Sequence, residues 1–191
     1  DLFMVLATQN PIEQEGTYNL PEAQLDRFLM YIKIDQPDAN TERKILKLVR
    51  TEQRETKEQD PAWQEFSKTV GKIAVEDILT ARREVLSMHV SESLEEYLVQ
   101  LIVATRKPEK YDASLRDKIL FGASPRATIA LDKCAKINAW LDGRDFVTPE
   151  DIHAVIYDVL RHRIILSFEA QADGLTTDDI IASLLKTVPL P

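Results

Sequence analysis

The sequence predicts a mainly α-helical protein that begins with a short segment of α/β character. From about residue 37 to the end of the 191-residue chain, apolar residues recur at spacings of three and four, as on the buried face of a helix. Residues 1–36 read instead as a strand, a loop, a short helix and a second strand. We therefore predict two parts, an N-terminal α/β segment over 1–36 and a helical domain over 37–191.

The N-terminal segment contains two apolar runs that predict strands. Residues 2–7 form an unbroken run, which is typical of a strand buried on both faces of a sheet. A polar loop with Gly16 follows, and then the pattern predicts a helix over 21–27 and a strand over 28–34.

Periodicity alone predicts the first helices of the helical domain. Their apolar stripes are Ile45, Leu48 and Val49, then Val75, Ile78, Leu79, Val85 and Leu86, then Leu94, Leu98, Leu101 and Ile102. Ser93 and Glu96 have the spacing of a capping box at the start of the third helix. Residues 51–72 are polar and weakly periodic, with Trp63 and Phe66 as isolated anchors.

The later helices also carry signals at their ends. Ser124 followed by proline predicts a helix start, and Gly143 predicts its end in a left-handed conformation. Thr148 followed by proline, and Thr176 with Asp179, predict two further helix starts. Between these helices, residues 164–168 are predicted as a short strand or an extended packing segment.

Composition excludes several classes of function. The net charge of −8 gives no indication of a basic surface that would bind nucleic acid or anionic lipid. No apolar run approaches the roughly 18 residues of a membrane span. The single cysteine, Cys134, excludes an intramolecular disulfide and is predicted to be a small buried hydrophobe. His89, His153 and His162 lack metal-ligand spacing, so no metal site is predicted. We expect a cytoplasmic protein with no nucleic-acid or membrane partner.

Three polar residues are candidates for chemistry. Asn10 follows the first predicted strand at the sheet edge where ligands bind, although Asn-Pro by itself favours a turn. Arg27 lies in the last turn of the helix predicted over 21–27, where complementing the helix dipole would also explain it. Arg126 lies beside the free N–H groups at a helix start, an arrangement suited to anions, or it reaches to a carboxylate such as Asp132. For the basic run 161–163, dipole complementarity suffices.

The sequence around these residues resembles that of the MoxR family of AAA+ ATPases. The matching runs are Ala-Thr-Gln-Asn-Pro-Ile-Glu-Gln-Glu-Gly over 7–16, Leu-Pro-Glu-Ala-Gln-Leu-Asp-Arg-Phe over 20–28 and Gly-Ala-Ser-Pro-Arg-Ala over 122–127. The resemblance implies that Asn10 is sensor 1, that Arg27 is an arginine finger acting in trans, and that Arg126 is the sensor-2 residue of a lid acting in cis. Asn10 and Arg126 would contact the nucleotide, and the role of Asp26 is open between steadying the finger and a subunit contact.

The same resemblance implies that the parent protein uses ATP and Mg²⁺, forms rings, and acts as a chaperone in complex maturation or metal-cofactor insertion into client proteins. The sequence contains no Gly-x-x-x-x-Gly-Lys-Ser/Thr run and no strand ending in paired acids. We therefore expect a C-terminal part of such an ATPase, comprising a remnant of the P-loop core and the helical lid, that neither binds nor hydrolyses ATP alone.

This expectation has a structural consequence and leaves alternatives open. In AAA+ sheets the strands corresponding to 2–7 and 28–34 are separated by the strand that precedes the P-loop, so we expect residues 1–36 not to form their native sheet. The alternatives are a magnesium-chelatase-type AAA+ subunit, which shares Leu-Asp-Arg-Phe, and a helical interaction module without a nucleotide. A DNA-binding helical domain is disfavoured by the net charge.

Overall fold

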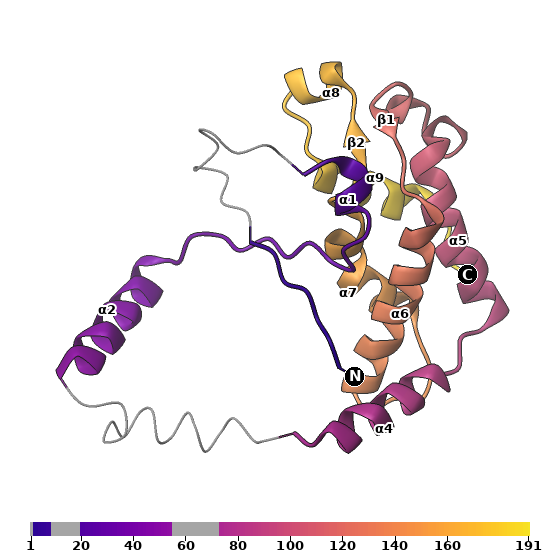
Figure 1. Cartoon of the computed structure of the whole chain (residues 1–191). Coiled ribbons are helices and arrows are strands. Elements are labelled where there is room, and N and C mark those ends of the chain that lie inside the picture. The colour runs from indigo at the N-terminus through magenta and orange to yellow at the C-terminus, as the bar shows by residue number, and fades with distance from the viewer. Residues whose placement is uncertain (1, 9–19, 55–72) are drawn as a thin grey trace. The chain divides into compact units, whose positions relative to one another are not determined.

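The computed structural model describes residues 2–8, 20–54 and 73–191 (Figure 1). Contacts group the chain into two compact units, one made of Asp1–Ile32 with Ala81–Pro191 and the other of Lys33–Thr80. The predicted boundary at residue 36, between a remnant of the P-loop core and the helical lid, is a functional boundary and stays a prediction.

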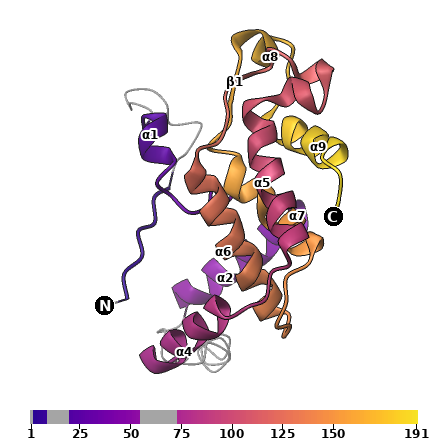
Figure 2. The ribbon, with the colours of Figure 1, turned by 90° about the vertical axis from the view of Figure 1, so that its right-hand side faces the viewer.

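Four helices build the core of the larger unit. They are α5 (Glu92–Arg106), α6 (Pro125–Leu141), α7 (Pro149–Leu160) and α9 (Thr177–Thr187). Helix α6 packs along α7 and α5, while α9 packs against α5 and α7 (Figure 2). The largest fully buried apolar side chains come from these helices: Leu101, Ile102, Leu131, Ile152, Ile156, Leu160, Ile180, Ile181 and Leu184. Each contributes about 1.5–3 kcal/mol of burial free energy. The predicted mainly helical fold is confirmed.

The helix ends follow the predicted signals with one exception. Ser124 caps α6, Gly143 has a φ of 75° after it, and capping boxes open α7 at Thr148 and α9 at Thr176. The predicted capping box at Ser93 is wrong. The side chain of Ser91 caps α5 instead by accepting from the Leu94 N–H at 3.3 Å, because Ser91 keeps the extended backbone of a cap while Ser93 is already helical.

A two-stranded antiparallel ribbon lies beside the helices. Strand β1 (Ile119–Phe121) pairs with β2 (Ile165–Leu166), which confirms a short strand within the segment predicted over 164–168, although Phe168 already belongs to the next helix. Helix α8 (Phe168–Ala172) and the 3₁₀ turns η1 (Pro108–Lys110) and η2 (Ala113–Leu115) were not predicted. They are too short to show a period in the sequence.

Gly122 joins β1 to α6 through a close backbone approach. A Cβ at this position would lie 2.4 Å from the backbone oxygen of Thr105. The Thr105 hydroxyl also accepts a hydrogen bond from the Ala123 N–H at 2.9 Å. Glycine is therefore required here by space, because the β1–α6 connection is bonded directly onto α5.

Cys134 lies inside α6 on its buried face. Its side chain is 5% exposed, and burial raises its pKa to about 11. The prediction of a small buried hydrophobe is confirmed.

The smaller unit contains α2 (Ala39–Arg54), and α4 (Val75–Leu86) begins in it. The side chain of Asp38 accepts from the Thr41 N–H at 2.8 Å at the start of α2. Both helices form where the stripes predict them, but the stripes are not buried: Ile45 and Leu48 of α2 and Leu79 of α4 are exposed. Helix α2 also extends into the stretch that was predicted to be weakly periodic. Trp63 and Phe66 lie outside the described residues.

Residues 2–8 and 30–38 contain no strand, so the strands predicted over 2–7 and 28–34 are not formed. This agrees with the expectation for residues 1–36, since a strand needs a hydrogen-bonded neighbour. Helix α1 (Glu22–Leu25) ends two residues earlier than predicted, because Asp26 and Arg27 enter a turn. The chain beyond it lies along the larger unit, where the Tyr31 N–H donates to the Asp158 carbonyl at 2.8 Å.

We expect Gly122→Ala to lower the free energy of unfolding by about 1–3 kcal/mol, because the added methyl group would force the connection away from α5. Urea denaturation of the chain measures this change. Arg116→Ala, at an exposed side chain with no ion pair to another described residue, is the control and should be nearly neutral. An unchanged stability of Gly122→Ala would contradict the close approach.

Candidate functional site

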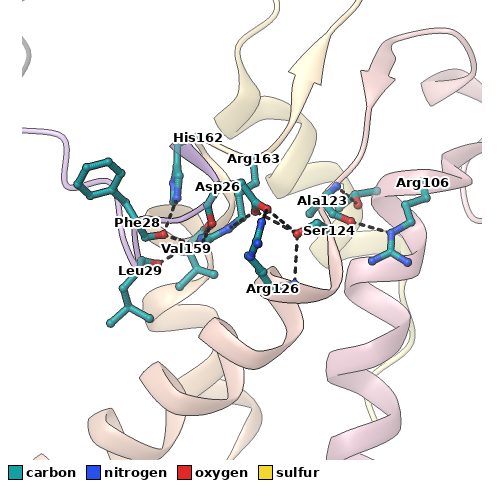
Figure 3. Close-up of polar contacts among 11 residues, drawn as sticks. Asp26, Phe28, Leu29, Arg106, Ala123, Ser124, Arg126, Val159, His162 and Arg163 are labelled. Atoms are coloured by element: carbon teal, nitrogen blue, oxygen red, sulfur yellow. Dashed lines mark hydrogen bonds and ion pairs between the residues drawn. The ribbon is translucent and has the colours of Figure 1, made fainter. Parts of the chain in front are cut away.

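Arg163 fixes the N-terminal segment to the end of α7. Its side chain is 2% exposed, and its Nε donates to Asp26 Oδ1 at 3.1 Å (Figure 3). Its Nη2 donates to the carbonyls of Asp26 and Phe28, and its Nη1 donates to those of Leu29 and Val159. All five N–H groups of the guanidinium are therefore used, four of them by residues 26–29.

Asp26 is the meeting point of the site. Besides Arg163, its carboxylate accepts from Ser124 Oγ at 2.8 Å and from Arg126 Nη1 at 3.2 Å (Figure 3). Burial by itself would raise the pKa of Asp26, but hydrogen bonds from Ser124, Arg126 and Arg163 outweigh it and lower the pKa. Asp26 is therefore an anion at neutral pH that ties α6 to the N-terminal segment.

Ser124 has two partners at once. Its hydroxyl accepts from the Arg126 N–H at 3.2 Å, as a helix cap does, and it donates to Asp26. A carboxylate in front of a helix N-terminus is also favoured by the helix dipole. The start of α6 and the position of Asp26 consequently support each other.

His162 packs on the same segment as a neutral ring. Its Nε2 lies 3.2 Å from the Phe28 carbonyl, which can only accept, so Nε2 carries the proton. The ring stacks on Tyr31 with centroids 6.2 Å apart, and the buried Nδ1 has no hydrogen-bond partner among the described residues. Burial, followed by the charge of Arg163, lowers the pKa of His162 to about 4.

Arg161 completes the basic run. It donates from Nε to Asp178 at 2.8 Å and from Nη1 to Asp158 at 2.9 Å and to the Tyr31 carbonyl at 3.0 Å. Complementing the dipole of α7, the role predicted for residues 161–163, therefore does not account for their main contacts. All three side chains bond the segment over 26–31, which makes Arg163 a site residue that the sequence analysis did not identify.

A surface pocket of about 160 Å³ opens where these elements meet. Its lining residues are Asp26, Arg27, Leu29, Arg126, Ile129, Ala130, Lys133 and Arg163. The lining thus includes four cationic side chains and one carboxylate. The side chains of Arg27 and Lys133 are exposed, and neither bonds to another described residue. This surplus of positive charge suits an anion with several oxygens, such as a polyphosphate.

The predicted site residues have different outcomes. Arg27 and Arg126 line the same pocket, and Arg126 pairs with Asp26 rather than with Asp132, which pairs with Lys136 at 3.0 Å. Asn10 lies outside the described residues. The described part of the chain holds no group of three or more His, Cys, Asp or Glu side chains that could ligate a metal, and none of its helices is long and apolar enough to span a membrane.

Comparisons with known proteins first define the class. Residues 113–184 match the model of the AAA lid domain, and residues 1–30 match that of the ATPase family associated with various cellular activities. A solved structure of a protein described as a candidate ATPase from Cytophaga hutchinsonii aligns with a TM-score of 0.86 at 43% identity, covering 99% of this chain and 54% of that one. The fold and these matches define an AAA+ ATPase sequence with its helical lid.

Curated relatives give the particular family. The chain is 38% identical to Chaperone MoxR1 of Mycobacterium tuberculosis and 34% identical to Protein MoxR of Methylorubrum extorquens, covering 99% and 98% of this chain and 47% and 55% of those proteins. It is also 36% identical to YeaC of Bacillus subtilis, described as uncharacterised, over all of this chain and 54% of that protein. The chain belongs to the MoxR family of AAA+ ATPases and spans about half the length of these relatives.

We expect Arg163→Ala to destabilise the larger unit by about 3–5 kcal/mol, because it removes the buried partner of the Asp26 charge and leaves several carbonyls without their donor. Arg126→Ala is the matched control: it removes the same charge from an exposed side chain with one hydrogen bond to Asp26, and should cost less than about 1 kcal/mol. Urea denaturation measures both. Equal losses would show that Arg163 is no more than a surface partner of Asp26.

We also expect the stability of the chain to depend on pH through His162. The unfolded state binds this proton below a pKa of about 6.5, whereas the folded state binds it only below about 4. Stability is therefore lost as the pH falls from 6.5 to 4, by up to about 3 kcal/mol. Unfolding free energies measured across this range should show the loss in the native chain and a smaller slope in His162→Gln. Identical slopes would contradict a neutral, buried ring.

Proposed function

We propose that this chain supplies the nucleotide-sensing arginines and the lid of a MoxR-like AAA+ enzyme that hydrolyses ATP. The observation that supports this most directly is the pocket at the start of α6, where Arg27 and Arg126 are two of the four cationic side chains in the lining. An isolated pair of exposed arginines has many explanations, but a pocket with a cationic surplus beside a helix N-terminus suits a terminal phosphate.

Arg27 is proposed as the arginine finger. Its guanidinium is exposed and bonds no described residue, while the backbone just beside it is held by Arg163. A free side chain on a fixed backbone is what a residue needs to reach into another subunit's site. There it would stabilise the charge that develops on the transferred phosphoryl group, an effect worth about 10³–10⁵ in rate.

Arg126 is proposed as the sensor-2 residue, contacting the same nucleotide as Arg27. The resemblance implies that Arg27 acts in trans and Arg126 in cis. The shared pocket favours contact of both arginines with one nucleotide, because two side chains that line one pocket of about 160 Å³ would contact the same phosphate group. If Arg27 serves the neighbouring subunit's nucleotide, we propose that Arg126 serves it too.

ATP and Mg²⁺ are proposed for the whole protein. When bound, the magnesium ion would neutralise charge on the phosphates. The pocket cations suit the phosphates, but the sequence offers no phosphate-binding loop and no strand that ends in paired acids for the metal. We therefore propose that another part of the protein holds the nucleotide and its metal, and that Asn10 orients the attacking water as sensor 1.

Ring assembly and chaperone-like action in the cytoplasm are proposed from the family. An arginine finger requires a neighbouring subunit, and one of the relatives is named a chaperone. The proposed outcome of ATP hydrolysis is maturation of a client protein, including insertion of a metal cofactor.

In the full-length protein we expect Arg27→Ala to lower kcat for ATP hydrolysis about 10³-fold, because transition-state charge loses its partner. Arg126→Ala should chiefly raise KM for ATP, and Arg116→Ala, an exposed arginine that does not line the pocket, is the control. Retention of more than a tenth of kcat by Arg27→Ala would refute the finger.

The 191-residue chain alone should bind ATP only weakly, through the pocket cations, and hydrolyse none, with affinity rising when a P-loop half is supplied. Turnover by the chain with both Arg27 and Arg126 replaced by alanine would overturn the assignment.

A further inference from the structure

We infer that Asp26 competes with bound phosphate for Arg126, so that arrival of the anion transfers Arg126 from Asp26 to the phosphate while Arg163 keeps Asp26 in place. This inference rests on the proposed phosphate site and assigns a positioning role to Asp26. It links phosphate binding at the lid directly to the residue that precedes the proposed finger.

The two arginines that share Asp26 differ in how firmly they are held. The side chain of Arg163 is 2% exposed and every N–H of its guanidinium is bonded, so moving it would break five hydrogen bonds that are buried or partly buried. The side chain of Arg126 is 57% exposed and makes one hydrogen bond to a described residue, to Asp26 at 3.2 Å. Arg126 is therefore the partner that leaves.

The environment of Arg126 also favours its release. A cation at the start of α6 opposes the positive end of the helix dipole, and Asp26 compensates that cost. A phosphate in the pocket would compensate it more strongly, because it carries more charge and more acceptor oxygens. Asp26 would remain neutralised by Arg163 and hydrogen-bonded by Ser124.

The exchange would reach Arg27 through the backbone. Asp26 and Arg27 are adjacent in the turn after α1, and both line the pocket. Loss of one of the three side chains that hold Asp26 changes the restraint on that turn. Occupancy of the pocket and freedom of Arg27 are then coupled.

The test is an NMR titration of the ¹⁵N-labelled 191-residue chain with inorganic tripolyphosphate. We expect Asp26→Asn to tighten binding about three- to tenfold, because it removes a competing carboxylate from the pocket. Asp132→Asn is the matched control: it removes the same charge from α6, outside the pocket lining, and should change affinity less than twofold. When Arg126 is already replaced by alanine, Asp26→Asn should raise the affinity for tripolyphosphate by at most a third of the factor seen in the native background.

A second measurement uses the native chain, in case Asp26→Asn loosens the segment over 26–31. During the titration the Arg126 Nε–H resonance should shift while that of Arg163 stays in place. Binding that needs Arg126 but does not tighten in a folded Asp26→Asn variant, or an Arg163 resonance that moves with Arg126, would overturn the role of Asp26 alone. Binding of tripolyphosphate that is absent or independent of Arg126 would overturn both this inference and the proposed phosphate site.

Discussion

The structure depends on one buried cation, the guanidinium of Arg163. A buried charge is costly unless its hydrogen bonds and its counter-ion are all supplied, and here Asp26 supplies the charge while backbone carbonyls supply the rest. Because four of the five donors are directed at residues 26–29, an irregular segment is held as firmly as a helix end. The placement of Asp26, and through it of Arg126, follows from this single side chain.

Two sources of order therefore meet at the pocket. The helices are stabilised by their own apolar core, in which α6, α7 and α9 bury Leu131, Ile156 and Ile181. The segment around Asp26 places only Met30 partly against that core among residues 26–30, and polar bonds to groups on the helices stabilise it further. Ser124 joins the two, since its hydroxyl caps α6 and donates to Asp26. A chain with intact helices but without these bonds would keep its lid and lose the pocket.

Local signals in the sequence predicted most helices and the family. Ser124, Thr148 and Thr176 mark helix starts because capping is decided within a few residues. The role of residues 161–163 was missed for the opposite reason. Arg161 donates to a backbone carbonyl 130 positions away. Every residue has such a carbonyl, so the sequence does not show which one will be the acceptor. The apolar runs over 2–7 and 28–34 form no strand, as the resemblance led us to expect, because a strand depends on a hydrogen-bonded neighbour.

The buried Cys134 has a practical consequence for spectroscopy. It is the single cysteine of the chain, and its high pKa leaves almost no thiolate at neutral pH to react with maleimides or nitroxide reagents. An Arg27→Cys variant would then accept a fluorophore or spin probe at one defined location, with the native thiol left untouched. Motions of the turn after α1 become accessible to measurements of probe mobility without first building a cysteine-free background.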